Sequence, residues 1–272
     1  HILILGKHSN LIVIKDISKL VNFFDLNINI YIYIMISTFL KKYDYNAFYT
    51  IALSSGAVIS TYPILRNYLS NNYINFRNLP LHKQNYSVKN LIKSSMLSSL
   101  CLISIPTIML PVYINGYWSN WWCHRLGILY TVNDTMGLIL VDKLPESTKI
   151  HHRITTTLCL LSLGIDFQTS TLGQMMYVYT LASASAYLVN YYLGMRLLFN
   201  KSDSLTLVRT KRRARDIYFI SCLLNWGWHL QWTFRNYNLI GLEHILYFFF
   251  LSYIIKDDLI LLNWLNKNKS KI

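Results

Sequence analysis

The chain has 272 residues, of which 53% are hydrophobic and only 14% are charged. Soluble domains carry about 25% charged residues, so this composition, with a mean hydropathy of +0.28, argues against a soluble enzyme and for an integral membrane protein. The net charge of +14 would suit a nucleic-acid-binding protein, but the basic residues gather between apolar segments, where they orient membrane helices, so we expect no nucleic-acid partner.

Apolar segments of about 20 residues, long enough to span a bilayer as helices, recur along the chain. The fold class that they predict is all-α, a multi-pass transmembrane bundle of seven spans, or eight if the polar first segment also crosses. We expect one long tilted helix over 167–195. In chain order the segments are Leu20–Leu40, Asn46–Leu65, Ser94–Ile114, Leu126–Val141, Ile150–Ile165, Phe167–Met195, Ile217–Phe234 and Asn236–Ile255.

These segments divide the chain into three parts. Residues 1–45 form an N-terminal extension with one candidate membrane helix, residues 46–262 form the transmembrane domain, and residues 263–272 form a basic C-terminal tail. With eight spans, most lysines and arginines fall on one side, in the termini and in the connections 66–93, 142–153 and 199–215. The positive-inside rule then places both termini on the cytosolic or matrix side.

Three ionisable residues interrupt the apolar segments and are candidate functional residues, because such groups are costly in a bilayer unless they face a protein interior. Asp134 lies in the middle of one span, and His151 and His152 begin the next. Asp134 should lie about 13 Å from the connecting turn by helical rise, deeper than the histidines, so the spacing leaves open whether they touch. These residues line a polar cavity with an inward histidine as acid or base, or the histidines cap their helix at the interface and Asp134 bonds to a neighbouring helix.

No metal site is expected at the histidine pair, because adjacent side chains on a helix point about 100° apart. A second polar stripe comprises Asn225, Trp228, His229 and Trp232, which share one helix face. This stripe either packs against other helices or lines the same cavity.

The order of these residues resembles the TLC-domain family, which groups ceramide synthases, TRAM proteins and related membrane proteins. The family's pattern Y-x-x-x-D, K-L and H-H-x-x-T corresponds to Tyr130, Asp134, Lys143-Leu144, His151-His152 and Thr155, and its later Ser and Asn correspond to Ser185 and Asn190. The resemblance extends over about residues 46–255. It implies six or seven spans around a polar cavity, with Tyr130, Thr155 and Asn190 in its lining.

The chain departs from this family where acyl transfer would need further groups. The segment Val178–Tyr187 contains no histidine and no acid, and Ser183 stands where the family has an acidic residue. The histidine usual at the start of the family's second span is replaced near Lys89 and Lys93. Half of the residues of an acyl-transfer site are therefore missing.

Two functions follow from these observations. The first is a membrane protein that binds, senses or acylates lipids, with a role in membrane lipid homeostasis and, from the resemblance, an endoplasmic-reticulum location. If it is an enzyme, His151, His152 and Asp134 would be its catalytic residues; acyl-CoA would be a substrate, and no cofactor is expected. The second is a non-catalytic subunit of a larger membrane complex, such as a translocon or a respiratory-type complex of the mitochondrial inner membrane.

Overall fold

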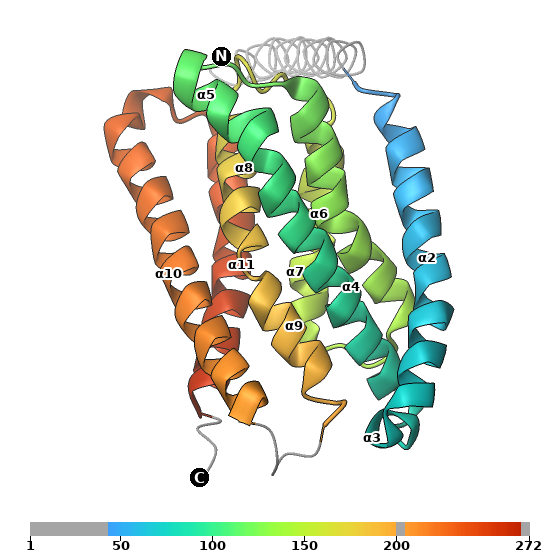
Figure 1. The fold of residues 1–272 in the computed structure, drawn as a ribbon. Helices are drawn as coiled ribbons and strands as arrows, with labels where there is room; N and C mark the ends of the chain where they lie inside the picture. The colour runs from blue at the N-terminus through green and yellow to red at the C-terminus, as the bar shows by residue number, and fades with distance from the viewer. Residues whose placement is uncertain (1–42, 200–204, 268–272) are drawn as a thin grey trace, which may run out of the picture. The chain divides into compact units, whose positions relative to one another are not determined.

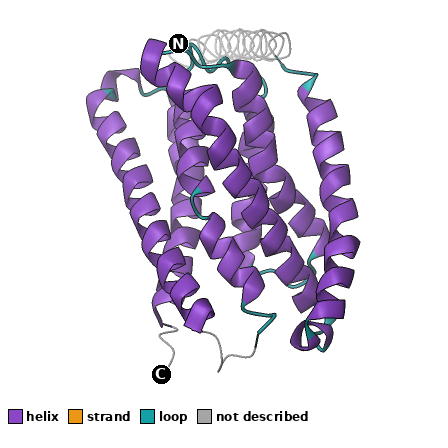
Figure 2. Ribbon diagram, viewed as in Figure 1, coloured by secondary structure: helices purple, strands orange, loops and turns teal. Residues whose placement is uncertain are grey.

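The computed structural model describes residues 43–199 and 205–267. The predicted segment Leu20–Leu40 and most of the N-terminal extension therefore lie outside the described residues. Within the described ranges the chain forms helices and turns and no strand, which confirms the all-α prediction (Figure 2). The helices are α2 Ala47–Asn72, α3 Ile74–Arg77, α4 Leu81–Ser104, η1 Ile105–Met109, α5 Leu110–Asn115, α6 Asn120–Leu140, α7 Glu146–Ser162, α8 Thr171–Ala184, α9 Tyr187–Met195, α10 Leu205–Arg235, η2 Tyr237–Leu239 and α11 Leu242–Lys267.

Six columns of helix form a closed ring in the unit that begins at Asp44. Around the ring, α4 packs on α6, α6 on α7, α7 on α11, α11 on α10, and α10 on the column made by α8 and α9, which returns to α4. Helix α2 lies outside this ring and packs against α4 and α6 (Figure 1). The ring places α4 and α11 on opposite sides of a shared interior.

Local signals fix several helix ends. The Ser119 hydroxyl accepts a hydrogen bond from the N–H of Trp122 at the start of α6, and Ser170 accepts one from Gly173 at the start of α8. Pro80 and Pro145 directly precede α4 and α7. Gly116 ends α5 at φ 68°, a backbone conformation that glycine adopts without steric cost.

Large apolar side chains cover the outward faces of the helices, while several charged side chains are buried inside the bundle. Leu53, Leu102, Leu224 and Leu246, on four different helices, are each at least half exposed, whereas Asp134 is completely buried. By length and composition, two helices are apolar enough to cross a membrane: α2 and the continuous stretch 81–115. The remaining spans of the predicted seven stay a prediction, and α7, α8 and α9 have only 17, 14 and 9 residues.

The prediction of one continuous helix over 167–195 is wrong. The chain turns at Ser185 and Ala186, whose N–H groups bond to carbonyls three residues back, and this turn separates α8 from α9 (Figure 2). The Ser185 hydroxyl also lies 2.7 Å from the carbonyl oxygen of Ala182 and 2.5 Å from the hydroxyl of Ser221 on α10. Side-chain bonds of this kind offer the backbone an alternative to the regular helical pattern.

Two predicted connections are also helical. Helix α4 begins at Leu81, so Lys89 and Lys93 lie inside a helix and not in the connection 66–93. Helix α10 begins at Leu205 and includes the basic segment 209–215, which was expected to be part of a loop. A hydropathy window ends at a charge, but a helix continues through it when the charge is solvated or paired.

The crossing of α4 and α9 depends on a glycine. A Cβ atom on Gly194 would lie 2.6 Å from Cγ of Leu91 and 3.1 Å from the carbonyl oxygen of Ser87. We expect Gly194→Val to lower the free energy of unfolding by about 1–3 kcal/mol, because an overpacked contact forces the helices apart. Equilibrium unfolding in detergent measures the change. In the matched control, Gly227→Val on α10, the added Cβ meets nothing within 4 Å, and an equal loss there would contradict this account.

An ion-pair cluster ties the start of α2 to α6. Asp44 accepts a hydrogen bond from Arg125 and lies 3.0 Å from Nδ1 of His124, and its N–H donates to the carbonyl of Leu163. Burial alone acts to raise the pKa of Asp44, but the contacts with Arg125 and His124 outweigh burial and hold it below its ordinary value.

This lowered pKa gives a pH dependence with a definite sign. The carboxylate stabilises the fold at pH values above about 4, the ordinary pKa of an aspartate, and this contribution is lost as the pH falls through the lower folded-state value. We therefore expect the melting temperature to fall below pH 4 in the wild type and to fall less steeply in Asp44→Asn. Thermal unfolding measured across pH 3–7 checks this, and parallel curves would contradict it.

Candidate functional site: a charged cavity inside the helical ring

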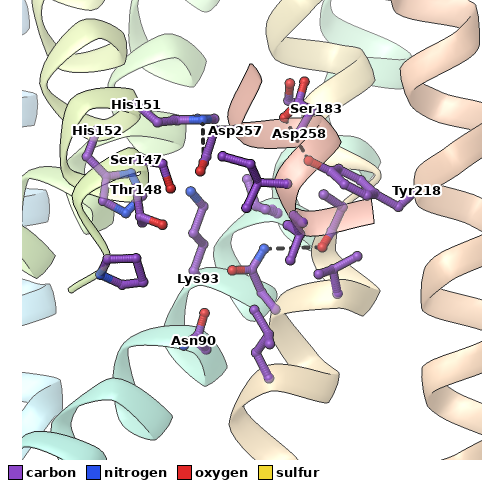
Figure 3. Close-up of a pocket in the computed structure, with 18 of the residues that line it drawn as sticks. Asn90, Lys93, Ser147, Thr148, His151, His152, Ser183, Tyr218, Asp257 and Asp258 are labelled. Atoms are coloured by element: carbon purple, nitrogen blue, oxygen red, sulfur yellow. Dashed lines mark hydrogen bonds and ion pairs between the residues drawn. The ribbon is translucent and has the colours of Figure 1, made fainter. Parts of the chain in front are cut away.

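A cavity of about 290 Å³ lies inside the ring, toward the end at which α4 and α7 begin and α9 and α11 finish. Every column of the ring contributes to its lining, so the cavity is a product of the whole bundle. Its polar lining includes lysines from α4, two histidines from α7 and two aspartates from α11, several of which Figure 3 shows as sticks.

Asp134 on α6 is the electrostatic centre of the cavity wall. Nζ of Lys93 lies 2.6 and 2.5 Å from its two carboxylate oxygens, and Nζ of Lys89 lies 4.0 Å from Oδ1. All three side chains are at least nine-tenths buried. Lys89 and Lys93 are four residues apart on α4 and therefore share one helix face. Two buried ammonium groups thus face a single carboxylate.

His152 bridges this cluster and uses both of its ring nitrogens. Nδ1 lies 3.3 Å from Oδ1 of Asp134, and Nε2 lies 2.7 Å from Nζ of Lys89. If Lys89 is charged it donates to Nε2, so the ring proton belongs on Nδ1, facing the carboxylate. This arrangement makes His152 a neutral bridge between α4 and α6, and neither nitrogen is left to act as a base on a ligand.

His151 has a different environment, although it is the next residue. Its Nδ1 lies 3.1 Å from Oδ2 of Asp257 on α11, and both side chains line the cavity (Figure 3). A carboxylate beside one ring nitrogen orients the imidazole, which leaves the other nitrogen for proton transfer. His151 with Asp257 is therefore the arrangement in this cavity best suited to general-base chemistry.

Two further groups complete the charge pattern. The Tyr218 hydroxyl donates a 2.7 Å hydrogen bond to Asp258, which lies next to Asp257 (Figure 3). The guanidinium of Arg196 lies 4.6 Å from the ring centre of Trp264 and 5.9 Å from that of Tyr86, and its Nε has no hydrogen-bond partner among the described residues.

The structure brings five of the sequence-predicted site residues together. Tyr130, Asn190, His151 and His152 line the cavity, and Asp134 lies directly behind its lysines. Thr155 instead lines a separate, mostly apolar crevice of about 40 Å³, and Tyr130 belongs to both spaces. The sequence spacing did not decide whether Asp134 contacts the histidines. In the structure Asp134 contacts His152.

The second polar stripe does not reach this cavity. Asn225 and Trp228 line a different groove between α8 and α10. His229 contacts the Tyr247 hydroxyl at 2.9 Å, and the Trp232 ring stacks on that of His244. His229 and Trp232 therefore pack α10 against α11, while Asn225 and Trp228 face α8.

Several cavity residues were not predicted as site residues. Lys89 and Lys93 were counted as loop charges, and the charges at 256–258 ended the last predicted span although α11 continues to Lys267. The i, i+4 spacing of the two lysines was an available signal. Arg196 lines the same cavity because the chain turns between α8 and α9, and this turn was not predicted from the sequence.

No protein-family model, curated protein or solved structure matches this chain. In the described ranges, 43–199 and 205–267, no group of three His, Cys, Asp or Glu side chains is placed to hold a metal ion. The cavity lining presents ammonium, guanidinium, carboxylate, hydroxyl and imidazole groups.

Proposed function

We propose that this protein is an integral membrane protein whose helical ring binds the polar head of a lipid. The observation that carries the proposal is a charge-lined cavity inside a bundle whose outer surface is apolar. Soluble proteins expose their charged residues and bury their apolar ones, whereas here Lys89 and Asp134 are inside and leucines cover the exterior. Contiguous apolar exteriors of this kind are typical of surfaces in contact with lipid.

The proposed orientation follows from the charge at the two ends. The cavity lies toward the end where the basic start of α10 is found, with Arg209, Arg212 and Arg213 in one helical segment. The positive-inside rule would place this end on the cytosolic side, in the endoplasmic reticulum on the basis of the TLC-like motif order. A lipid head would then enter from the cytosolic leaflet.

The test is purification in mild detergent followed by lipid mass spectrometry. We expect one lipid class to be enriched over its share of the host membrane. A charge-conserving substitution that fills the cavity, Ser183→Trp, should remove this enrichment, because Ser183 lines the cavity from α8. Gly227→Trp on the outer part of α10 is the matched bulk control. Equal lipid recovery from all three proteins would contradict the proposal.

The pairing of His151 with Asp257 favours a second candidate function, acyl transfer. Here His151 would take a proton from an amine or hydroxyl, the resulting nucleophile would attack the carbonyl of an acyl thioester such as acyl-CoA, and the thiolate would leave. Asp257 would orient the imidazole and stabilise its positive charge. In this assignment Asp134, Lys89 and His152 hold the cavity wall in place and do not touch the reacting atoms.

A further inference from the structure

Charges of opposite sign lie on opposite walls of the cavity. Lys89 and Lys93 on α4 share the single carboxylate of Asp134, so one positive charge of this group is uncompensated. Arg196, directly after α9, adds a second cation, which lies between the rings of Tyr86 on α4 and Trp264 on α11. Because α4 and α9 pack together, the lysines and Arg196 enter the cavity from adjacent columns, and Arg196 also reaches α11.

The opposite wall belongs to α11, which packs on α7 and α10 across the ring. It presents two adjacent carboxylates, Asp257 and Asp258, both in the cavity lining. Their partners include an imidazole, His151, and a phenol hydroxyl, Tyr218, and among the described residues neither forms an ion pair with a lysine or arginine. The acidic wall therefore lacks the neutralisation that Asp134 receives.

Resting on the proposed function, we infer that the cavity selects a zwitterionic head group that carries a phosphate and an amine. The phosphate lies against Arg196 and Lys93, and the ammonium lies between Asp257 and Asp258. A guanidinium suits phosphate because its planar fork donates two parallel hydrogen bonds. The buried Nε of Arg196, which has no hydrogen-bond partner in the part of the chain that the structure describes, is one of these donors. A head group with only one charge leaves the other wall uncompensated.

Binding to the full chain in detergent tests this with five probes of known charge. Four carry the same single acyl or alkyl chain: lysophosphatidylethanolamine, lysophosphatidic acid, a long-chain primary amine and monoacylglycerol. The fifth, phosphoethanolamine, is the zwitterionic head without a chain. We expect lysophosphatidylethanolamine to bind at least about tenfold more tightly than each of the other three amphiphiles, since one hydrogen bond to a charged group is worth roughly that factor.

Two substitutions test which charge of the head group each wall binds. Arg196→Gln should remove the preference over the long-chain amine, and Asp258→Asn should remove the preference over lysophosphatidic acid. Arg213→Gln, on an exposed part of α10, is the matched control and should leave both preferences unchanged. The wild-type comparison stands without any variant, so a misfolded substitution does not decide the result.

The outcomes separate this inference from the proposed function. If monoacylglycerol binds as tightly as lysophosphatidylethanolamine, the zwitterion inference is overturned while lipid binding stands. If no amphiphile binds, both fail. If phosphoethanolamine alone binds as tightly as the lysolipid, the head-group site is supported and the lipid role is overturned.

Discussion

Asp134→Asn is expected to lower the free energy of unfolding by about 3–5 kcal/mol, the usual cost of removing one partner of a buried ion pair. The substitution changes the size of the side chain very little, so the loss reports charge and not packing. It leaves the ammonium groups of Lys89 and Lys93 buried together with no carboxylate between them. Unfolding of the detergent-solubilised protein in a denaturing-detergent titration measures the change.

Two comparisons make this result specific. Asp216→Asn removes a carboxylate that pairs with Arg215 on an exposed part of α10, and it should cost less than about 1 kcal/mol. Replacing Asp134 by Leu together with Lys89→Met and Lys93→Met removes every charge of the cluster, and this triple variant should be more stable than Asp134→Leu alone. If Asp134→Asn and Asp216→Asn had equal effects, the cluster would not be a buried one.

His151→Gln and His152→Gln change adjacent residues but should affect different properties, the first the reaction rate and the second the stability. If the protein transfers acyl groups, His151→Gln should lower the rate by about 10²–10⁴-fold, the usual contribution of a general base, and should leave stability nearly unchanged. His152→Gln should instead lower stability, because His152 bridges Lys89 and Asp134. Transfer from acyl-CoA to a long-chain amine, measured beside thermal unfolding, separates the two roles.

Three results would contradict the roles given to these two histidines. Full transfer activity in His151→Gln would remove the base role from His151. A wild-type protein without any transfer activity would remove the acyl-transfer candidate and leave lipid binding as the function of the cavity. A stable His152→Gln variant would show that the bridge does not hold α4 against α6.

The helices could largely be predicted from hydropathy, but their ends could not. Lys89 and Lys93 lie within α4 and pair with Asp134 on another helix, and a single-sequence window has no information about that partner. The same reason explains why the predicted span 236–255 ended before Asp257 and Asp258. Hydropathy treats a charge as facing lipid or water, whereas here the charges face one another.

The candidate site could be predicted only in part, because the sequence shows which residues are unusual but not which of them meet. Asp134, His151 and His152 could be found from the sequence because an ionisable group within an apolar segment is conspicuous. Which histidine acts as a bridge and which one faces Asp257 depends on where α4 and α11 lie around the ring, and this is a tertiary property. The stripe that includes His229 shared the same local pattern but packs two helices together.

Cysteine accessibility in sealed vesicles tests the central claim, a lipid-embedded ring around a charge-lined cavity that opens to one side of the membrane, most directly. In a background with Cys101, Cys123, Cys159 and Cys222 replaced by alanine, Asn190→Cys reports the cavity and Leu246→Cys reports the outer face. A membrane-impermeant maleimide should label Asn190→Cys from the side where α10 begins, and it should not label Leu246→Cys although that side chain is half exposed. Rapid labelling of Leu246→Cys, with Asn190→Cys unreactive from both sides, would contradict the account.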